Sequence, residues 1–268
     1  MTDAQLAIDE LERFRLDGRV ALVTGGTGGI GGRLCRAFAR VGAQVVVHGR
    51  DAERADAVAR TLRDEGAGAA TAIGDLTRRA DADRVVDEAL AAFGRVDVIV
   101  TTVGGGAGTA LHPAEDYPED AWDRIMDLNL RSALLPTQAA VRAMIAGGRG
   151  GRVLHFSSVR GQLGIDNGFS AYVAAKGALD ALTRQQATEW AKHGITVNAI
   201  SPTFVATPQV ADLLSDEEFR SGLERRIPLH RIAETDDLVG AALLLCSDAS
   251  SFITGQVLTL DGGLTACQ

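Results

Sequence analysis

The chain contains 268 residues, of which 46% are apolar and 4% aromatic, and it carries a formal net charge of −8. This length fits one large α/β domain with a core of Ala, Val, Leu and Ile. An acidic chain without a run of Lys or Arg is not expected to bind nucleic acid or an anionic membrane. No apolar run is long enough to span a membrane, and the charged first residues lack the apolar core of a signal peptide.

Cysteine and histidine are too sparse for a disulfide framework or a metal site. Cys35, Cys246 and Cys267 are scattered along the sequence, and the five histidines show no spacing typical of metal ligands. We therefore expect a reduced, cytoplasmic protein that holds no metal.

The first 15 residues are expected to form a helical extension ahead of a single domain. Their apolar side chains fall on one stripe of a short amphipathic helix. This stripe contains Leu6, Ile8, Leu11 and Phe14. Residues 16–268 contain no linker, low-complexity block or internal repeat, so we expect them to form one domain.

Apolar strand-like segments alternate with longer amphipathic segments along the whole domain. Expected strands are 20–24, 44–49, 69–74, 96–102, 151–157, 196–201 and 256–260. Most are continuous apolar runs, which are typical of parallel strands buried on both faces. Expected helices are 30–41, 52–65, 81–93, 119–146, 170–193, 216–226 and 235–245. The alternation predicts a doubly wound α/β Rossmann fold with a seven-stranded parallel sheet flanked by helices.

A glycine-rich segment follows the first expected strand. Six of the ten residues in Val23–Gly32 are glycine. Between a buried strand and a helix, such a turn lets the backbone approach a phosphate, which the N–H groups of the helix N-terminus then bind. A glycine-rich turn without a ligand is the alternative, since glycine patterns alone are a weak signal.

The spacing Thr24-Gly25-x-x-x-Gly29-Ile30-Gly31 resembles the dinucleotide loop of the short-chain dehydrogenase/reductase family. Further family landmarks follow in order, so the resemblance extends from Leu16 to Gly263. They are Asp75-Leu76 after the third strand, Asn129 in a helix, Ser158 after the fifth strand, Tyr172 and Lys176 as Y-x-x-x-K, Thr254-Gly255, and Asp261-Gly262-Gly263. The resemblance implies one dinucleotide-binding and catalytic domain.

The spacing of Tyr172 and Lys176 predicts an interaction between them even without the family resemblance. Residues four apart share one helix face, and an ammonium beside a phenol favours the phenolate. We therefore expect Lys176 to lower the pKa of Tyr172 toward the range of a general acid or base.

The resemblance implies a catalytic tetrad of Asn129, Ser158, Tyr172 and Lys176. Hydride would pass between a nicotinamide and a carbonyl or secondary alcohol carbon, with Tyr172 as the general acid or base. Ser158 would hold the reacting oxygen, and Ser157 is the less favoured alternative for this role. Lys176 would also bind the nicotinamide ribose, and Asn129 would position a water for proton relay.

The end of the second strand indicates which cofactor is used. It reads His48-Gly49-Arg50, without the acidic residue that would bind a ribose 2′-hydroxyl. Because a guanidinium suits a phosphate, we expect NADP(H) rather than NAD. The alternatives for Arg50 are pairing with Asp51 or capping the next helix.

Together these features place the cofactor against a long series of residues. They are Gly25, Thr27, Gly29, Ile30, Gly31, Arg50, Asp75, Leu76, Val103, Gly104, Tyr172, Lys176, Pro202, Phe204, Val205 and Thr207. Two segments depart from the family pattern: Thr101-Thr102-Val103-Gly104 replaces N-N-A-G, and Pro202-Thr203 replaces P-G. The family's first Asn ties neighbouring strands, and the hydroxyl of Thr101 does not carry that role over intact.

The substrate is expected to lie against residues 104–110, 159–169 and 203–231, and the last segment is interpreted as a lid. Arg160, Gln162, Asp166 and Asn167 suit a polar substrate, whereas Leu163, Ile165, Phe169, Phe204 and Val205 suit an apolar one. Both possibilities stay open. The runner-up functions are an NAD-dependent alcohol or sugar-acid dehydrogenase and a non-catalytic dinucleotide sensor. The family resemblance implies a homotetramer.

Overall fold

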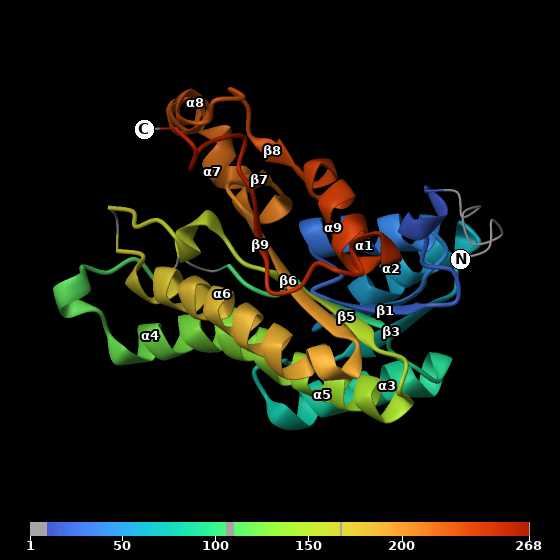
Figure 1. Ribbon diagram of the computed structural model, residues 1–268. Helices are drawn as coiled ribbons and strands as arrows, with labels where there is room; N and C mark the ends of the chain where they lie inside the picture. Colours follow the sequence, from blue (N-terminus) through green and yellow to red (C-terminus); the bar gives the residue numbers. More distant parts are fainter. Residues whose placement is uncertain (1–9, 106–109, 167, 268) are drawn as a thin grey trace.

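A computed structural model describes residues 10–105, 110–166 and 168–267 (Figure 1). Leu6 and Ile8 of the expected extension, Gly106 and Gly108 of the substrate loop, and Asn167 lie outside these ranges. Of the expected extension, the described part forms a 3-10 helix, Glu12–Phe14. None of the described helices has the length and apolar character needed to cross a membrane.

Seven parallel strands form one sheet in the order β3-β2-β1-β4-β5-β6-β9, which confirms the predicted fold. The strands are β1 Val20–Thr24, β2 Gln44–Gly49, β3 Ala69–Ile73, β4 Val98–Thr101, β5 Gly151–Phe156, β6 Ile195–Pro202 and β9 Val257–Leu260. Every residue of β1, β4 and β5 is buried, as expected for apolar runs covered on both faces. The strand order reverses between β1 and β4, which is where this class of sheet binds ligands.

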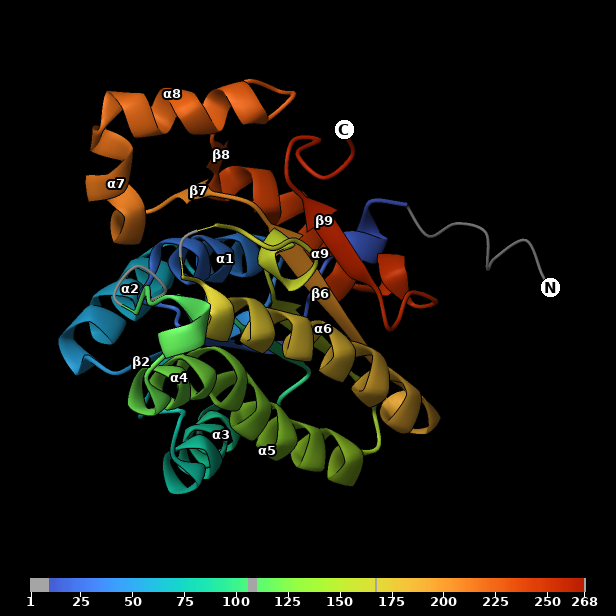
Figure 2. The ribbon, with the colours of Figure 1, turned by 90° about the vertical axis from the view of Figure 1, so that its left-hand side faces the viewer.

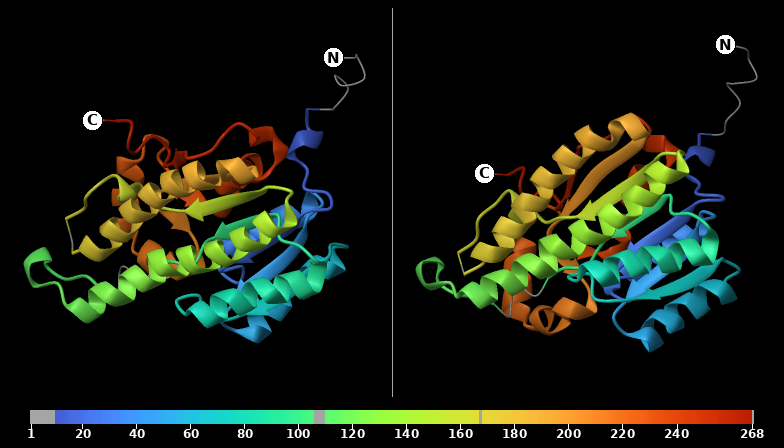
Figure 3. Two further views of the ribbon diagram at one scale, coloured as in Figure 1. Left: turned by 60° about the horizontal axis from the view of Figure 1, so that its bottom comes forward. Right: turned by 90° about the horizontal axis from the view of Figure 1, so that it is seen from below.

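Helices cover both faces of the sheet and supply its two main cores. On one face lie α1 Gly29–Arg40, α2 Ala52–Asp64 and α9 Val239–Cys246. On the other lie α3 Arg79–Phe93, α5 Ser132–Gly147 and α6 Ser170–Trp190. Figure 3 shows α3 (teal), α5 (green) and α6 (yellow to orange) side by side across this second face.

The expected helix over residues 119–146 is not a continuous α-helix. It consists of α4 Glu119–Met126, a π-helical turn at Asp127–Arg131, and α5. The π turn contains Asn129, whose side chain is fully buried. Such turns often mark functional positions because they redirect one side chain out of the regular helical ladder.

The segment after β6 forms a separate layer beyond the carboxyl edge of the sheet (Figure 2). A two-residue strand, β7 Val205–Ala206, pairs with β8 Ala233–Glu234, and the short helix α7 Ala211–Ser215 precedes α8 Glu217–Arg226. The sequence analysis anticipated only α8. Asp216 caps α8 by accepting hydrogen bonds from the backbone of Glu218 and Phe219.

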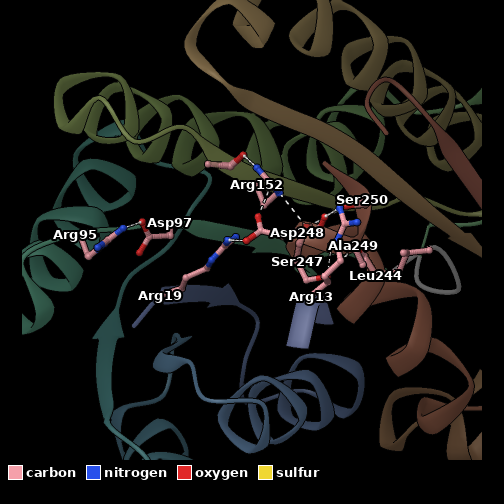
Figure 4. A network of polar contacts seen from close by, with 11 residues as sticks. Arg13, Arg19, Arg95, Asp97, Arg152, Leu244, Ser247, Asp248, Ala249 and Ser250 are labelled. Atoms are coloured by element: carbon pink, nitrogen blue, oxygen red, sulfur yellow. Dashed lines mark hydrogen bonds and ion pairs between the residues drawn. The ribbon is translucent and has the colours of Figure 1, made fainter. Parts of the chain in front are cut away.

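At the opposite edge of the sheet, Asp248 joins the beginning of the chain to the middle of it (Figure 4). Its carboxylate pairs with Arg19 before β1 and with Arg152 on β5, where the Arg152–Asp248 distance is 3.1 Å. Arg13 donates to the Asp248 carbonyl oxygen at 3.1 Å. The arginine cluster therefore fixes the amino ends of the strands, away from the expected site.

Near the carboxyl edge, a buried histidine joins β4, β5 and α6. The Nε2–H of His155 donates to Gln186 Oε1 at 3.0 Å, so Nδ1 accepts the hydroxyl of Thr101 at 2.8 Å. Burial lowers the pKa of His155 to about 4, which keeps the ring neutral. Thr101 thus does tie neighbouring strands, through an imidazole rather than an amide.

Thr101→Val should destabilise the protein. The change preserves side-chain shape but leaves Nδ1 of the fully buried His155 without a donor, so we expect the free energy of unfolding to fall by about 1–3 kcal/mol. Thr196→Val is the matched control: the buried hydroxyl of Thr196 has no partner among the described residues, and losing it should be neutral or stabilising. Urea unfolding of both variants tests this, and equal losses would contradict it.

Candidate active site

The predicted site residues converge at the carboxyl ends of β1, β4, β5 and β6. The glycine-rich turn leaves β1, Val103 and Gly104 follow β4, Ser158 follows β5, and Pro202 ends β6. Tyr172 and Lys176 reach the same place from the first turns of α6. The topology therefore brings together segments up to about 180 residues apart, which is the arrangement expected of a ligand site in an open α/β sheet.

The glycine-rich turn is packed too closely for side chains. Gly25 has a φ of +68°, in the left-handed region that favours glycine. A Cβ at Gly31 would clash with the Gly25 carbonyl oxygen, and one at Gly29 would lie 2.9 Å from Thr207. The residue before α1, Gly28, provides no side-chain cap, so the first N–H groups of α1 are left for a ligand. These features fit the phosphate groups of a dinucleotide.

His48, buried on β2, holds this turn in place. Gly25 N–H donates to His48 Nδ1 at 3.1 Å, and His48 Nε2–H donates to the Gly74 carbonyl oxygen at 3.1 Å. Burial lowers the pKa of His48 to about 4, so the ring stays neutral. The sequence analysis did not find this role, because it depends on the spatial adjacency of β1, β2 and β3.

Arg50 lies exposed just beyond β2 and forms no ion pair among the described residues. The alternative pairing with Asp51 is not present: Asp51 instead caps α2 by accepting the backbone N–H of Arg54 at 3.1 Å. The positive charge of Arg50 acts on Asp75, just after the third strand, and favours the ionised carboxylate. Burial opposes ionisation of Asp75, but hydrogen bonds from Thr77 hold its pKa below the ordinary value.

Ser158 and Tyr172 lie close together at the centre of the site, where the Ser158 hydroxyl acts to lower the pKa of Tyr172. The Ser158 hydroxyl also accepts the backbone N–H of Arg160 at 3.2 Å. Ser157 points elsewhere, since its hydroxyl donates to the carbonyl oxygen of Lys176 at 3.3 Å. The partly buried Tyr172 also packs edge-on against Phe169, with ring centroids 6.4 Å apart.

Lys176 is almost completely buried behind Tyr172. Its Nζ donates to the Phe156 carbonyl oxygen at 2.9 Å and lies 5.6 Å from the centroid of the Tyr172 ring. Burial lowers the pKa of Lys176 to about 8, while the charge of Asp180 acts in the opposite direction. Asp180 is itself buried one turn further along α6, against Gly161.

The expected direction of the Tyr172 pKa shift is wrong. Burial raises the pKa of Tyr172, and the nearby Ser158 hydroxyl and the charge of Arg160 only partly oppose it. The helical spacing of Tyr172 and Lys176 does not reveal the desolvation that they share. Near neutral pH, Tyr172 is therefore a neutral phenol that carries a proton.

Asn129 contacts the loop after β4 rather than Tyr172. Its Oδ1 accepts the Gly105 N–H at 2.8 Å, and its Nδ2 donates to the carbonyl oxygens of Gly105 and Ile125, each at 3.0 Å. Gly104 fits between Asn129 and Lys176, since a Cβ there would lie 2.9 Å from Asn129 Oδ1 and 3.4 Å from Lys176 Nζ. The expected relay water of Asn129 stays a prediction.

The segment after β6 closes over the glycine-rich turn. Thr207 contacts Gly29, and the side chain of Gln209, which the sequence analysis missed, lies against Gly105. Val205 packs into the main core and Phe204 packs against Phe219 of α8, with ring centroids 5.7 Å apart. Of the predicted contacts from this segment, Thr207 therefore lies against the turn, whereas the side chains of Phe204 and Val205 have other packing partners.

Comparison with known proteins agrees with this geometry. The family model described as enoyl-(acyl carrier protein) reductase matches residues 25–265. A gluconate 5-dehydrogenase of Gluconobacter oxydans is 39% identical over 255 residues, which are 94% of this chain and 96% of that protein.

Two solved structures extend the comparison. A gluconate 5-dehydrogenase from Burkholderia cenocepacia, in complex with NADP and tartrate, superimposes with a TM-score of 0.91 at 37% identity and covers 97% of this chain and 100% of its own. A 7α-hydroxysteroid dehydrogenase complexed with NADH and 7-oxo glycochenodeoxycholic acid gives 0.89 at 30% identity and covers 96% and 98%. By sequence and by structure, the chain belongs to the short-chain dehydrogenase/reductase family and is an oxidoreductase.

Proposed function

We propose that this protein uses NADP(H) to interconvert a carbonyl group and a secondary alcohol, with Tyr172 as the general acid or base. The observation that carries the proposal is the juxtaposition of Ser158, Tyr172 and the buried Lys176 beside a glycine-rich turn that fits a dinucleotide. The guanidinium of Arg50, which forms no ion pair among the described residues, and the NADP complex of the Burkholderia relative support the choice of cofactor.

The cofactor would be held by Gly25, Gly29 and Gly31 at its phosphates, with Arg50 toward the adenosine end and Lys176 toward the nicotinamide end. When bound, it supplies or accepts the hydride. In the reduction direction the carbonyl oxygen gains negative charge, and the Ser158 hydroxyl donates a hydrogen bond to it. The neutral Tyr172 then gives its proton to that oxygen.

Lys176 supports this proton transfer by its charge. Proton transfer converts Tyr172 to a phenolate. The ammonium of Lys176, whose Nζ lies 5.6 Å from the centroid of the Tyr172 ring, stabilises this negative charge. Asn129 would keep the Gly104–Gly105 backbone next to Lys176 and, as the family pattern implies, position a relay water there.

Relatives named for gluconate, and the tartrate in the Burkholderia complex, make hydroxy acids the first compounds to test. We also propose that residues 16–268 act as one domain and that the protein is a cytoplasmic homotetramer. The small side chains Ala171, Ala174, Ala175 and Ala178 on α6 support close helix packing, although Ala171 and Ala175 are already buried within one chain. Sedimentation that shows a monomer at all concentrations would contradict the tetramer.

Tyr172→Phe should abolish turnover while leaving the cofactor bound. Loss of the proton donor is expected to lower kcat by about 100-fold or more, because general acid catalysis contributes on that order. NADPH oxidation with ketones and keto acids measures this. Tyr117→Phe is the matched control, since among the described residues the Tyr117 hydroxyl donates to the Ala110 carbonyl oxygen alone. Full activity of Tyr172→Phe would rule out the proposed role.

NADPH affinity should weaken as the pH rises through about 8. The pKa of Lys176 is lowered to about 8, so its ammonium is present below that pH and is lost above it. Because the charge of Asp180 raises this pKa, Asp180→Asn should move the transition to lower pH. Fluorescence titration between pH 6 and 10 measures it, with the exposed Asp123→Asn as control. A shift to higher pH would contradict this assignment.

Arg50→Asp should change the cofactor preference. A carboxylate at this position repels a 2′-phosphate and accepts ribose hydroxyls, so kcat/KM should fall by about 10- to 100-fold with NADPH and rise with NADH. Arg60→Asp on the exposed side of α2 makes the same charge change at a distance from the turn. If the wild-type enzyme turns over only with NADH, the cofactor proposal is wrong.

A further inference from the structure

Arg160 is a largely buried cation that has no counter-charge among the described residues. Its side chain, on the 3-10 helix Val159–Gly161, is only 9% exposed and donates to the Gly164 carbonyl oxygen at 3.0 Å. Among the described residues it forms no ion pair with a carboxylate. A buried guanidinium has five N–H groups, and leaving the charge uncompensated is unfavourable. The arrangement becomes favourable when an anion completes it.

A second cation, Arg226, lies in the segment after β6 and acts on Arg160 by its positive charge. Arg226 is the last residue of α8, is exposed, and forms no ion pair within the described part of the chain. Burial first, and then the positive charge of Arg226, lower the pKa of Arg160, so the two guanidinium groups repel each other. An anion between them would relieve both the repulsion and the desolvation of Arg160.

The pair lies next to the reacting groups. Arg160 is two residues beyond Ser158, and its backbone N–H donates to the Ser158 hydroxyl at 3.2 Å. The positive charge of Arg160 also acts on the Tyr172 hydroxyl, where it favours a lower pKa. An anion held there would belong to a molecule whose carbonyl or carbinol group could lie against Ser158 and Tyr172. Guanidinium groups bind planar carboxylates through paired, charge-assisted hydrogen bonds.

We propose that Arg160 and Arg226 form a carboxylate subsite, so that the substrates are keto acids and hydroxy acids rather than neutral carbonyl compounds. The inference rests on the proposed oxidoreductase function and names its substrate class.

The kinetic test compares each acid with a neutral partner that carries the same ketone. The pairs are 5-keto-D-gluconate with L-sorbose, in which CH2OH replaces the carboxylate, and levulinate with methyl levulinate. Wild-type enzyme with NADPH should favour the acid of a pair. Arg160→Met and Arg226→Met should lower kcat/KM for the acid by about 10- to 100-fold and for the neutral partner by much less.

Two further variants separate charge from structure. Arg225→Met removes a positive charge from the same turn of α8 but from a side chain that contacts Ser221, so it should keep the preference for acids. Arg160→Lys should restore part of the preference lost in Arg160→Met. If Arg160→Met and Arg226→Met lower kcat/KM equally for acid and neutral substrates, Arg160 only stabilises its loop and the subsite is refuted.

If none of these ketones is turned over, the proposed function is contradicted for these compounds. A binding measurement then tests the carboxylate subsite separately. Calorimetry with NADPH-loaded enzyme and tartrate should detect binding in wild type and Arg225→Met, and at least ten-fold weaker binding in Arg160→Met and Arg226→Met. If no ketone is turned over, two results would overturn the proposed subsite. Either tartrate does not bind, or it binds equally well when either arginine is replaced. Circular dichroism of each variant confirms that it is folded.

Discussion

The ammonium of Lys176, held out of water 2.9 Å from the Phe156 carbonyl oxygen, constrains most of the surrounding structure. Gly104 must lack a side chain, because a Cβ there would lie 3.4 Å from Nζ and 2.9 Å from Asn129. Gly161 must lack one too, because the buried carboxylate of Asp180 fills that space. The same desolvation that brings the pKa of Lys176 down to about 8 raises the pKa of Tyr172. The buried ammonium of Lys176 and the buried carboxylate of Asp180 together thus link the loop after β4, the turn after β5 and α6.

Two neutral imidazoles set the framework around this charge. His48 links the glycine-rich turn to the end of β3, and His155 links β4 to α6. Both have a pKa of about 4 because burial disfavours the imidazolium. Unfolded histidines titrate near 6.5, so the folded state loses stability as the pH falls from there toward 4 and keeps it above. Near neutral pH the framework therefore adds no positive charge of its own, and the charge at the centre of the site comes from Lys176.

The sequence predicts the main sheet well because its strands are continuous apolar runs, and each of the seven strands of this sheet begins and ends within two residues of expectation. Local pattern is insufficient where tertiary contacts decide. The π turn at Asp127–Arg131 interrupts an unbroken helical pattern, and β7 pairs with a strand 28 residues further along. The roles of His48 and His155 depend on neighbouring strands. The pKa direction of Tyr172 depends on burial, which the spacing of Tyr172 and Lys176 does not reveal.

Net charge is a poor guide to the charge of the site. The chain has 35 acidic and 27 basic residues, and the arginines of its amino edge and many on its surface are paired with carboxylates. In contrast, Arg50, Arg160 and Arg226 at the carboxyl edge form no ion pair among the described residues, and Lys176 donates to a carbonyl oxygen. Arg160 and Lys176 are buried, and cations walled by low-dielectric protein attract anions more strongly than cations on an open surface. An acidic protein can therefore exclude nucleic acid and still concentrate small anions where its reaction takes place.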